Sequence, residues 1–397
     1  MYLPRELEAQ LRTAVERFPV VAVTGPRQCG KSTLVRHVFG RDDHVVYLDL
    51  ERPSDLRKLD DAEWFFSANK DKLICLDEIQ RHPELFPLIR SLVDEWNRPG
   101  CFVVLGSASR DLLKQSSESL AGRIVYKRLT PFLWDEVREH YSLEDYLSSG
   151  GFPRSLLAGD AAGSFEWRES FISTFVERDL ALWAGFAPRT MTLLWTMLAH
   201  VNGQATDYSR LASSLGVSSV SVKRYIDLLA STYMLEVVLP DVSNLGKRLV
   251  KSPRVYVADS GILTALLGLQ TFNDLIGHPS YGSVWEQTVL RTIRGAVPDA
   301  EVTYYRTSHG AEMDFVVRFV GEGGHRHVIA VECKTSSAST LNQGNYNAID
   351  DISPEHTYVV AQVRDRWSMA EGIDVVGLSD LAQALHVGQK GTTKEDF

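Results

Sequence analysis

The sequence predicts an α/β protein made of several domains. Over roughly the first 130 residues, short apolar runs alternate with amphipathic stretches, the pattern of a parallel sheet covered by helices. Apolar residues then recur at helical spacing from residue 131 to about 200, and strand-like runs return between residues 302 and 334. The 397 residues are 44% hydrophobic and 23% charged, which is enough material for about two to four domains with buried cores.

Charge and cysteine usage narrow the class of protein. A formal net charge of −9 argues against a protein coated in basic surface, although a local basic face can still bind nucleic acid. No stretch is long and apolar enough to span a bilayer, and the first residues lack the pattern of a secretory signal. The cysteines are scattered, at positions 29, 75, 101 and 333. We therefore expect a reduced, cytoplasmic protein with no membrane partner.

An amphipathic helix at residues 5–18 leads to an apolar strand at 20–23, which is followed by G-x-x-x-x-G-K-S and a helix at 34–39. In this context, the motif predicts a phosphate-binding loop, because glycines let successive backbone N–H groups turn toward anionic oxygens. Lys31 can reach the β and γ phosphates, and the Ser32 hydroxyl can ligate Mg²⁺. The predicted nucleotide-binding residues are Gly25, Pro26, Arg27, Gln28, Cys29, Gly30, Lys31, Ser32 and Thr33. The expected cofactors are ATP and Mg²⁺.

Two acids end a later apolar strand. Residues 44–50 predict a second strand, and residues 72–76 predict a third that leads into Asp77 and Glu78. Asp77 can hold the metal, usually through water, and Glu78 can orient and polarise the attacking water. Such a pair alone is a common strand ending. Downstream of a phosphate loop, we favour the catalytic interpretation.

A helical stripe at residues 85–96 and a strand at 101–106 follow, and this strand delivers Ser107. A polar residue beside the strand that carries the two acids fits a sensor of the γ-phosphate. The alternative is a serine that caps the next helix. Four alternating strands and helices imply a doubly wound parallel sheet that binds the nucleotide at its carboxyl edge.

Several motifs together resemble a family of prokaryotic AAA-type ATPases with a nuclease-like C-terminal region. They are residues 25–32, 76–80, 106–107, 120–123 and 150–153, and the resemblance covers nearly the whole chain. It implies an AAA-type core, a helical lid and action as a homo-oligomer. In AAA-type enzymes, an arginine from a neighbouring subunit often completes the site. Arg123 is the candidate, with Arg110 and Arg128 in reserve, and the alternative for each is an ordinary surface arginine.

Residues 206–235 predict a helix-turn-helix. The apolar spacing gives a helix up to Leu215, a tight turn at 216–218, and a second helix that presents polar side chains outward. A possible wing starts at residue 235. The outward polar residues are Ser219, Ser221, Lys223 and Arg224, and the cations Lys247, Arg248, Lys251 and Arg254 follow. We predict phosphate contacts to duplex DNA, and the alternative is a protein-docking module.

The C-terminal strands resemble the nuclease core pattern written PD-(D/E)xK, in which an Asp opens one strand and Glu-x-Lys closes the next. Glu332 and Lys334 share a face of their strand, and a hairpin brings Asp314 beside them. With Glu286, these carboxylates can hold Mg²⁺ while Lys334 positions a water. Gln343 is a weaker candidate for support. The alternative is that these residues are solvated strand ends.

These patterns predict four domains: residues 1–132 as the ATPase core, 133–200 as a helical lid, 201–257 as a winged helix-turn-helix and 258–397 as a restriction-endonuclease-like α/β domain. The expected activity is Mg²⁺-dependent ATP hydrolysis by a protein that engages DNA and carries a nuclease-like site. The alternative is an ATP-switched regulatory or scaffold protein whose nuclease-like domain only binds DNA or a protein.

Overall fold

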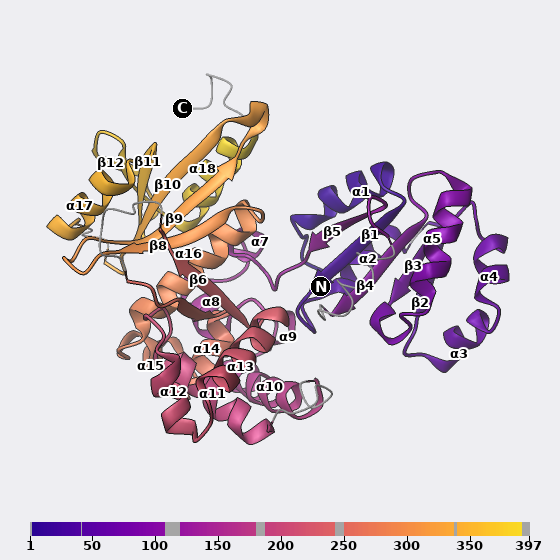
Figure 1. Ribbon diagram of the computed structural model, residues 1–397, viewed down its shortest axis with the longest axis horizontal. Helices are drawn as coiled ribbons and strands as arrows, with labels where there is room; N and C mark the ends of the chain where they lie inside the picture. Colours follow the sequence, from indigo (N-terminus) through magenta and orange to yellow (C-terminus); the bar gives the residue numbers. More distant parts are fainter. Residues whose placement is uncertain are drawn as a thin grey trace. The chain divides into compact units, whose positions relative to one another are not determined.

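The chain forms two compact units in a computed structural model that describes residues 2–40, 42–107, 120–179, 187–242, 250–336 and 340–390 (Figure 1). The first unit comprises residues 1–132 and 231–233, and the second comprises residues 133–230 and 234–397. Within the described ranges, no helix is long and apolar enough to cross a membrane.

The first unit is built on a parallel sheet, as predicted, but the sheet has a fifth strand beyond the four that the sequence indicated. Its strands have the order β2-β3-β4-β1-β5. They are β1 (Val20–Gly25), β2 (Val45–Asp49), β3 (Leu73–Asp77), β4 (Phe102–Ser107) and β5 (Ile124–Arg128). The apolar runs of β1 and β3 are buried along their whole length because helices cover both faces of the sheet.

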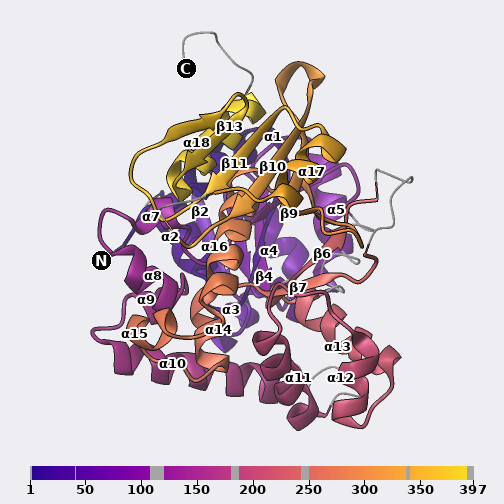
Figure 2. The same ribbon diagram turned by 90° about the vertical axis from the view of Figure 1, so that its left-hand side faces the viewer.

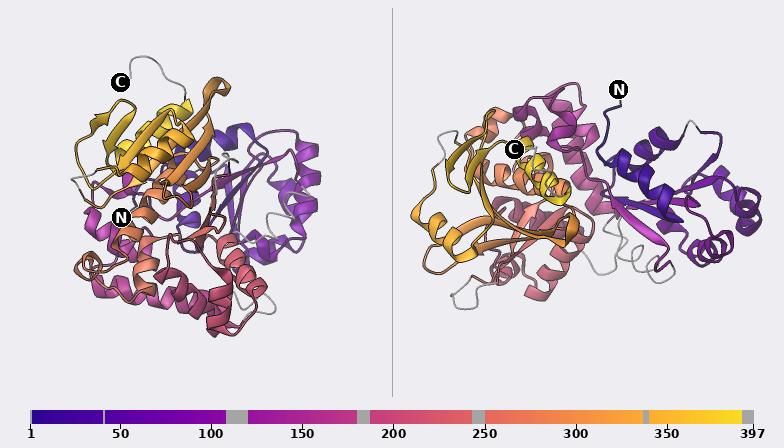
Figure 3. Two further views of the ribbon diagram at one scale, coloured as in Figure 1. Left: turned by 60° about the vertical axis from the view of Figure 1, so that its left-hand side comes forward. Right: turned by 90° about the horizontal axis from the view of Figure 1, so that it is seen from above.

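Helices lie on both faces of this sheet (Figure 3, right). Two hydrophobic clusters, one on each face, hold them to it. Val21 and Val23 of β1 pack with Leu11 and Leu34, while Val20 on the other face belongs to the cluster of the later helices. The helices are α1 (Leu7–Arg17), α2 (Lys31–Phe39), α3 (Pro53–Leu56), η1 (Arg57–Leu59), α4 (Ala62–Ala68), η2 (Ile79–Arg81) and α5 (Leu85–Trp96).

The second unit begins with a helical region, as expected from the apolar spacing. Its helices are α7 (Trp134–Val137), α8 (Leu143–Ser149), α9 (Pro153–Leu156), α10 (Ala161–Thr174), η3 (Phe175–Asp179), α11 (Pro188–His200), α12 (Tyr208–Leu215), α13 (Ser219–Ser231), α14 (Ser260–Leu266), α15 (Phe272–Ile276) and α16 (Tyr281–Ala296). Buried Arg168 ties three of them together, because its Nη1 donates to Ser148 O at 2.6 Å and to Thr264 Oγ1 at 2.7 Å.

The Gly-Gly-Phe-Pro motif at 150–153 has a packing explanation. Gly150 has φ 72°, and a Cβ there would lie 2.1 Å from Asp259 Oδ1. The same carboxylate accepts a hydrogen bond from Gly151 N at 2.9 Å and forms a buried ion pair with Arg291 at 2.6 Å. Only glycine permits this close approach.

A mixed eight-stranded sheet completes the second unit, with the order β12-β13-β11-β10-β9-β8-β6-β7; Figure 2 shows β13, β11, β10 and β9 side by side. The elements are β6 (Leu235–Pro240), β7 (Arg254–Val257), β8 (Glu301–Arg306), β9 (Glu312–Val320), η4 (Glu322–Gly324), β10 (Arg326–Cys333), α17 (Gln343–Ile352), β11 (His356–Val360), β12 (Trp367–Ala370), β13 (Ile373–Val376) and α18 (Leu378–Lys390). β6 pairs with β7, as the strands of a wing do, but β6 also pairs with β8. One sheet therefore includes strands from both sides of the domain boundary that the sequence predicted between residues 257 and 258.

Candidate functional site

The loop between β1 and α2 has the backbone of an anion cradle. Gly25 has φ 154°, and a Cβ there would lie 2.0 Å from Leu129 O, so a side chain would fill the space the loop needs. Gln28 and Gly30 are left-handed, with φ of 63° and 103°. Such alternation turns neighbouring N–H groups to one side, where the N-terminus of α2 adds partial positive charge. The loop therefore fits a phosphate group.

Lys31 begins α2 and is buried in the loop. Its Nζ donates to Gly25 O at 3.0 Å and to Pro26 O at 2.9 Å, which holds the ammonium against the cradle. Ser32 is half-buried on the next position of the helix, whereas Thr33 is exposed. A cation and a hydroxyl at this point can meet a phosphate and its metal.

A buried arginine that no motif indicates supports the loop from behind. Arg5 Nη1 donates to Cys29 O at 3.2 Å and its Nη2 donates to Thr130 O at 2.6 Å. Its guanidinium lies 4.6 Å from the ring centroid of Phe132. These contacts fix the back of the loop to the segment after β5. Arg5 lies in an ordinary amphipathic stretch, so sequence spacing offered no signal for this role.

Asp77 and Glu78 lie at the carboxyl edge of the sheet that also holds the loop. β3 is parallel to β4, which is parallel to β1, so all three strands end on the same side. Asp77 is buried and accepts hydrogen bonds from Tyr47 OH and, at 3.1 Å, from Glu78 N. Burial raises the pKa of Tyr47, and its hydrogen bond to Asp77 raises it further, so Tyr47 stays a donor to this carboxylate.

Glu78 has φ 58°, which is uncommon for a residue other than glycine and marks local strain. Burial raises its pKa above the ordinary glutamate value, while a hydrogen bond from Gln80 and the charge of Lys31 act in the opposite direction. A half-buried carboxylate of raised proton affinity suits a residue that polarises water.

The predicted γ-phosphate sensor and arginines are dispersed. Ser107 ends β4 with its backbone paired to Gly25, but its side chain lies outside the described residues, as does all of Arg110. Arg123 precedes β5 at the edge opposite the loop and forms an ion pair with Asp94, with Nη2 to Oδ2 at 2.9 Å. Arg128 ends β5 beside Thr24, on the side of the loop. Within one chain, Arg123 does not reach the phosphate loop.

In the second unit, the four predicted nuclease-like residues gather at one place. Asp314 Oδ2 accepts a hydrogen bond from Cys333 N at 2.9 Å, which holds β9 against the end of β10. Lys334 Nζ lies 2.7 Å from Glu332 Oε1, as their shared strand face predicts. Glu286 comes from α16 and is linked to Asp314 through an arginine.

That arginine is Arg254, and its position corrects the expectation that it faces DNA. Its side chain is 4% exposed, and its Nη1 lies 3.2 Å from Glu286 Oε1 and 3.4 Å from Asp314 Oδ1, while Nη2 pairs with Glu312. The guanidinium is 4.5 Å from the ring centroid of Tyr304. Arg254 begins β7, all of whose residues are buried, so its side chain points inward. There it supplies the positive charge that these acids need.

Burial also changes the proton affinity of these acids. Burial raises the pKa of Glu286 well above its ordinary value, with Asp314 adding repulsion, and burial with the same neighbour raises the pKa of Glu332 to about 8. Among the described residues, Glu332 Oε2 is buried and has no hydrogen-bond partner, which suits an oxygen that ligates a cation. However, the acids Glu286, Asp314 and Glu332 do not form a group of ligand atoms within 4.8 Å of one another.

The predicted supporting residue Gln343 lies elsewhere. It is exposed at the start of α17 and its Nε2 donates to Asn347 Oδ1 at 3.0 Å. Buried Asn345, two residues further along the chain, instead donates from Nδ2 to Glu312 O at 3.0 Å. Gln343 therefore does not contact the acids within the described residues, and its supporting role stays a prediction.

Three of the four polar residues that were predicted to face outward from α13 are exposed. In α13, Val222 and Ile226 are buried, and the outward side chains of Ser219, Lys223 and Arg224 are exposed. Ser221 is half-buried, Lys223 pairs with Asp227 at 2.8 Å, and Lys251 is exposed. Lys247 and Arg248 lie outside the described residues.

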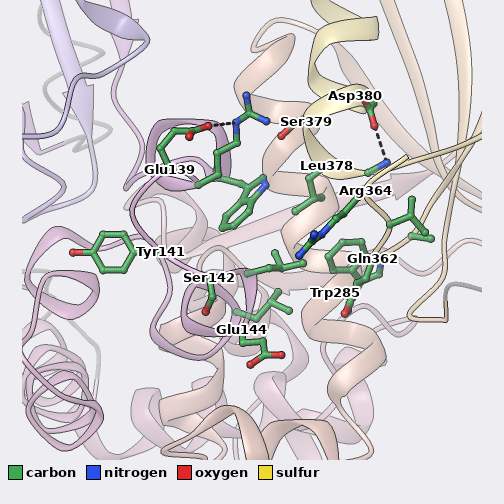
Figure 4. A pocket seen from close by; sticks show the side chains of 17 residues that line it. Glu139, Tyr141, Ser142, Glu144, Trp285, Gln362, Arg364, Leu378, Ser379 and Asp380 are labelled. Atoms are coloured by element: carbon green, nitrogen blue, oxygen red, sulfur yellow. Dashed lines mark hydrogen bonds and ion pairs between the residues drawn. The ribbon is translucent and has the colours of Figure 1, made fainter. Parts of the chain in front are cut away.

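A cavity of about 760 Å³ lies in the second unit among α7, α8, α16, the residues after β11 and the start of α18 (Figure 4). Trp285 forms part of its wall, with Nε1 donating to Val360 O at 3.1 Å, and the side chain of Arg364 extends across it (Figure 4). None of the catalytic, nucleotide-binding or metal-binding residues predicted from the sequence lines this cavity.

Comparison with known families divides the chain into three matched segments. Residues 17–138 match an AAA domain, residues 140–273 match the domain of unknown function DUF8612, and residues 281–381 match the domain of unknown function DUF4143. The AAA match contains the phosphate loop together with Asp77 and Glu78.

Two curated proteins are similar over most of the chain. The uncharacterized proteins Rv2008c of Mycobacterium tuberculosis and Mb2031c of Mycobacterium bovis are each 36% identical over 373 residues, covering 94% of this chain and 83% of theirs. Among solved structures, a Walker-type ATPase of Pyrococcus abyssi is 17% identical with a TM-score of 0.47, covering 67% of this chain and 96% of its own. The RuvB Holliday junction branch migration motor of Thermotoga maritima is 18% identical with a TM-score of 0.32, covering 64% and 92%. Structural similarity at this level carries no argument about what the chain binds.

Proposed function

Because the chain belongs to the family of the mycobacterial proteins Rv2008c and Mb2031c and carries an AAA domain, we propose that it is a Mg²⁺-dependent ATPase. One observation carries the proposal: the cradle at Gly25, with Lys31 inside it, shares a sheet edge with Asp77 and Glu78. A phosphate anchor and two carboxylates at one edge are what phosphoryl transfer to water requires.

Each residue has a distinct role in this proposal. The loop amides and Lys31 bind the phosphates, and Ser32 and Asp77 would hold Mg²⁺, which neutralises charge on the phosphate oxygens. Glu78 orients the attacking water, and its raised pKa makes it a better acceptor for the proton that the water loses. Tyr47 and Arg5 position Asp77 and the loop without touching the nucleotide.

The test separates binding from hydrolysis. Lys31→Ala should abolish ATP binding, whereas Glu78→Gln should bind ATP normally but lose at least about 100-fold in phosphate release. Glu84→Gln is a matched control, since this exposed acid of the same segment pairs with His82. Unchanged turnover in Lys31→Ala would remove the loop from the mechanism, and normal turnover in Glu78→Gln would remove that residue.

The finer organisation extends the proposal. We assign residues 133–200 to a helical lid, 201–257 to a winged helix-turn-helix that contacts DNA phosphates, and 258–397 to a nuclease-like domain. We keep Ser107 as a γ-phosphate sensor. We also keep Arg123 as the arginine that a neighbouring copy contributes to the ATP site in a homo-oligomer. The thiols at 29, 75, 101 and 333 are free, which supports the cytoplasmic location we propose.

Metal-dependent cleavage of DNA is the second candidate function. It is favoured by the convergence of Glu286, Asp314, Glu332 and Lys334, with two carboxylates for Mg²⁺ and a lysine to position water. The positive charge of Arg254 offsets the negative charge of these acids. This favours the alternative in which the domain binds DNA or a protein without cutting it.

The experiment that separates these two functions is a nuclease assay on single- and double-stranded DNA and RNA, with Mg²⁺ or Mn²⁺ and with or without ATP. Cleavage that is lost in Asp314→Asn would establish an ATP-regulated nuclease. An absence of cleavage on every substrate, with ATP hydrolysis intact, would favour a regulatory or scaffold protein.

A further inference from the structure

Two histidines and a glutamate converge at the far end of β10, on a site separate from the acids around Arg254. His325 precedes β10 and His327 is its second residue, so the two side chains lie on the same face of an extended strand. Glu355 precedes the neighbouring strand β11, and its backbone N donates to Val328 O at 2.8 Å. Two neighbouring backbone segments therefore bring three side chains to one point.

The ligand atoms already have the spacing of a metal site. His325 Nε2 lies 3.2 Å from Glu355 Oε1, and His327 Nδ1 lies 2.9 Å from Glu355 Oε2. One atom from each residue can be chosen so that all three lie within 4.8 Å of one another. A tetrahedral ion with bonds of about 2.1 Å keeps its ligands roughly 3.4 Å apart, so only small side-chain movements are needed.

The site is built on a rigid frame. The ring of His327 stacks on Phe319, its partner across the β9–β10 pair, with centroids 4.9 Å apart at 23°. The side chain of His327 is 19% exposed, whereas those of His325 and Glu355 are 66% and 41% exposed. Within the described ranges, the ion pairs of Glu355 go to these two histidines. One ligand is thus held in place while two face solvent.

We propose that His325, His327 and Glu355 bind a divalent transition-metal ion of the zinc class. Two imidazoles and one carboxylate suit Zn²⁺, Ni²⁺ or Cu²⁺, whereas Mg²⁺ and Ca²⁺ prefer all-oxygen sites. Three protein ligands leave at least one coordination position for water. The ion would clamp the turn at η4 to the entrance of β11, and this proposal does not depend on ATP hydrolysis or nuclease activity.

The test measures Zn²⁺ binding to tag-free, metal-stripped full-length protein by calorimetry, with Co²⁺ substitution to report ligand type by visible absorption. The expected result is one site whose affinity falls at least tenfold in Glu355→Gln and in His325→Gln. His309→Gln, at an exposed histidine in another turn, should bind as the wild type does. Asp314→Asn should also retain the site, which separates it from the acids around Arg254.

Equal Zn²⁺ affinity in the wild type and in both ligand variants would overturn the proposal. Loss of binding in Asp314→Asn but not in Glu355→Gln would place the ion at the other acids and would overturn it as well. Because His325 is largely exposed, His325→Gln should fold normally, and an unchanged urea unfolding midpoint in metal-free buffer would verify this.

Discussion

At the residue scale, the absence of a side chain at Gly25 is a tight constraint on the proposed ATP site. Leu129 N donates to Thr24 O at 2.7 Å, so the segment after β5 closes directly over the start of the loop. The Leu129 carbonyl then occupies the space that a Cβ at Gly25 would take. The loop can curl around a phosphate only because residue 25 has no side chain.

Gly25→Ala should therefore lose ATP binding and destabilise the first unit by about 1–3 kcal/mol, because the methyl group must push the Leu129 carbonyl or the loop aside. Nucleotide titration and urea unfolding measure the two effects. Gly122→Ala is the matched control, since Gly122 also has positive φ but a Cβ there would meet none of the described residues within 4 Å. An ATP affinity in Gly25→Ala equal to that of the control would show that the close approach is not required.

Arg254 offers a second prediction at this scale. Arg254→Met should destabilise the second unit by about 3–5 kcal/mol, because it leaves buried carboxylates without their counter-charge. If these acids form a latent cation site, Mn²⁺ should restore more stability to Arg254→Met than to the wild type. Thermal unfolding with and without Mn²⁺ measures this. Arg366→Met, which removes a more exposed partner of Asp374, should show no such rescue. Equal effects of Mn²⁺ on both variants would exclude a cation site at Glu286 and Asp314.

At the scale of elements, the apolar runs predicted the first four strands of the parallel sheet and several of the longer helices, whereas β5 and the elements after residue 343 were not predicted. The runs around Val20, Leu73 and Phe102 became buried parallel strands, because a strand covered on both faces must be apolar throughout. Sequence spacing could not predict that β6 joins β8, since strand pairing across more than 60 residues leaves no local pattern. The inward turn of Arg254 depends on the same long-range pairing.

The site residues also differ in how well the sequence could predict them. Asp77 and Glu78 end one apolar run, and Lys31 follows the loop after another, so the parallel sheet brings all three to one edge. Arg5 contacts a loop more than 20 residues away through backbone carbonyl groups. Every residue has such a carbonyl, so its presence does not depend on the sequence. Such contacts to backbone atoms are invisible to motif analysis.

The helix pair α12 and α13 carries a prediction for DNA binding. Lys223→Ala and Arg224→Ala should each weaken binding to duplex DNA several-fold regardless of sequence, and each should lower the salt dependence, because phosphate contacts release counterions. Fluorescence anisotropy at several salt concentrations measures both. Lys58→Ala removes an exposed lysine from the first unit and controls for net charge. An unchanged salt dependence in both α13 variants would favour a protein-docking role.

At the scale of the whole molecule, the two units have separate hydrophobic cores. The clusters around Phe102 and Leu34 belong to the first unit, whereas the large cluster around Trp195 and Trp285 contains only residues of the second. Each unit therefore has its own source of cooperative stability, and a single free energy of unfolding does not describe the chain.

Thermal unfolding should consequently show two transitions that respond to different ligands. In Glu78→Gln, which should hold ATP without consuming it, Mg²⁺-ATP at 100 times its Kd should stabilise the first unit by about 2.7 kcal/mol. Zn²⁺ should raise only the transition of the second unit, through His325, His327 and Glu355. Differential scanning calorimetry with each ligand measures both shifts. In our proposal, ATP binds residues of the first unit alone. If ATP also shifted the unfolding transition of the second unit, the two units would have to be energetically coupled, as in an ATP-driven switch. A first transition that ignores ATP would contradict the assignment of the nucleotide site itself.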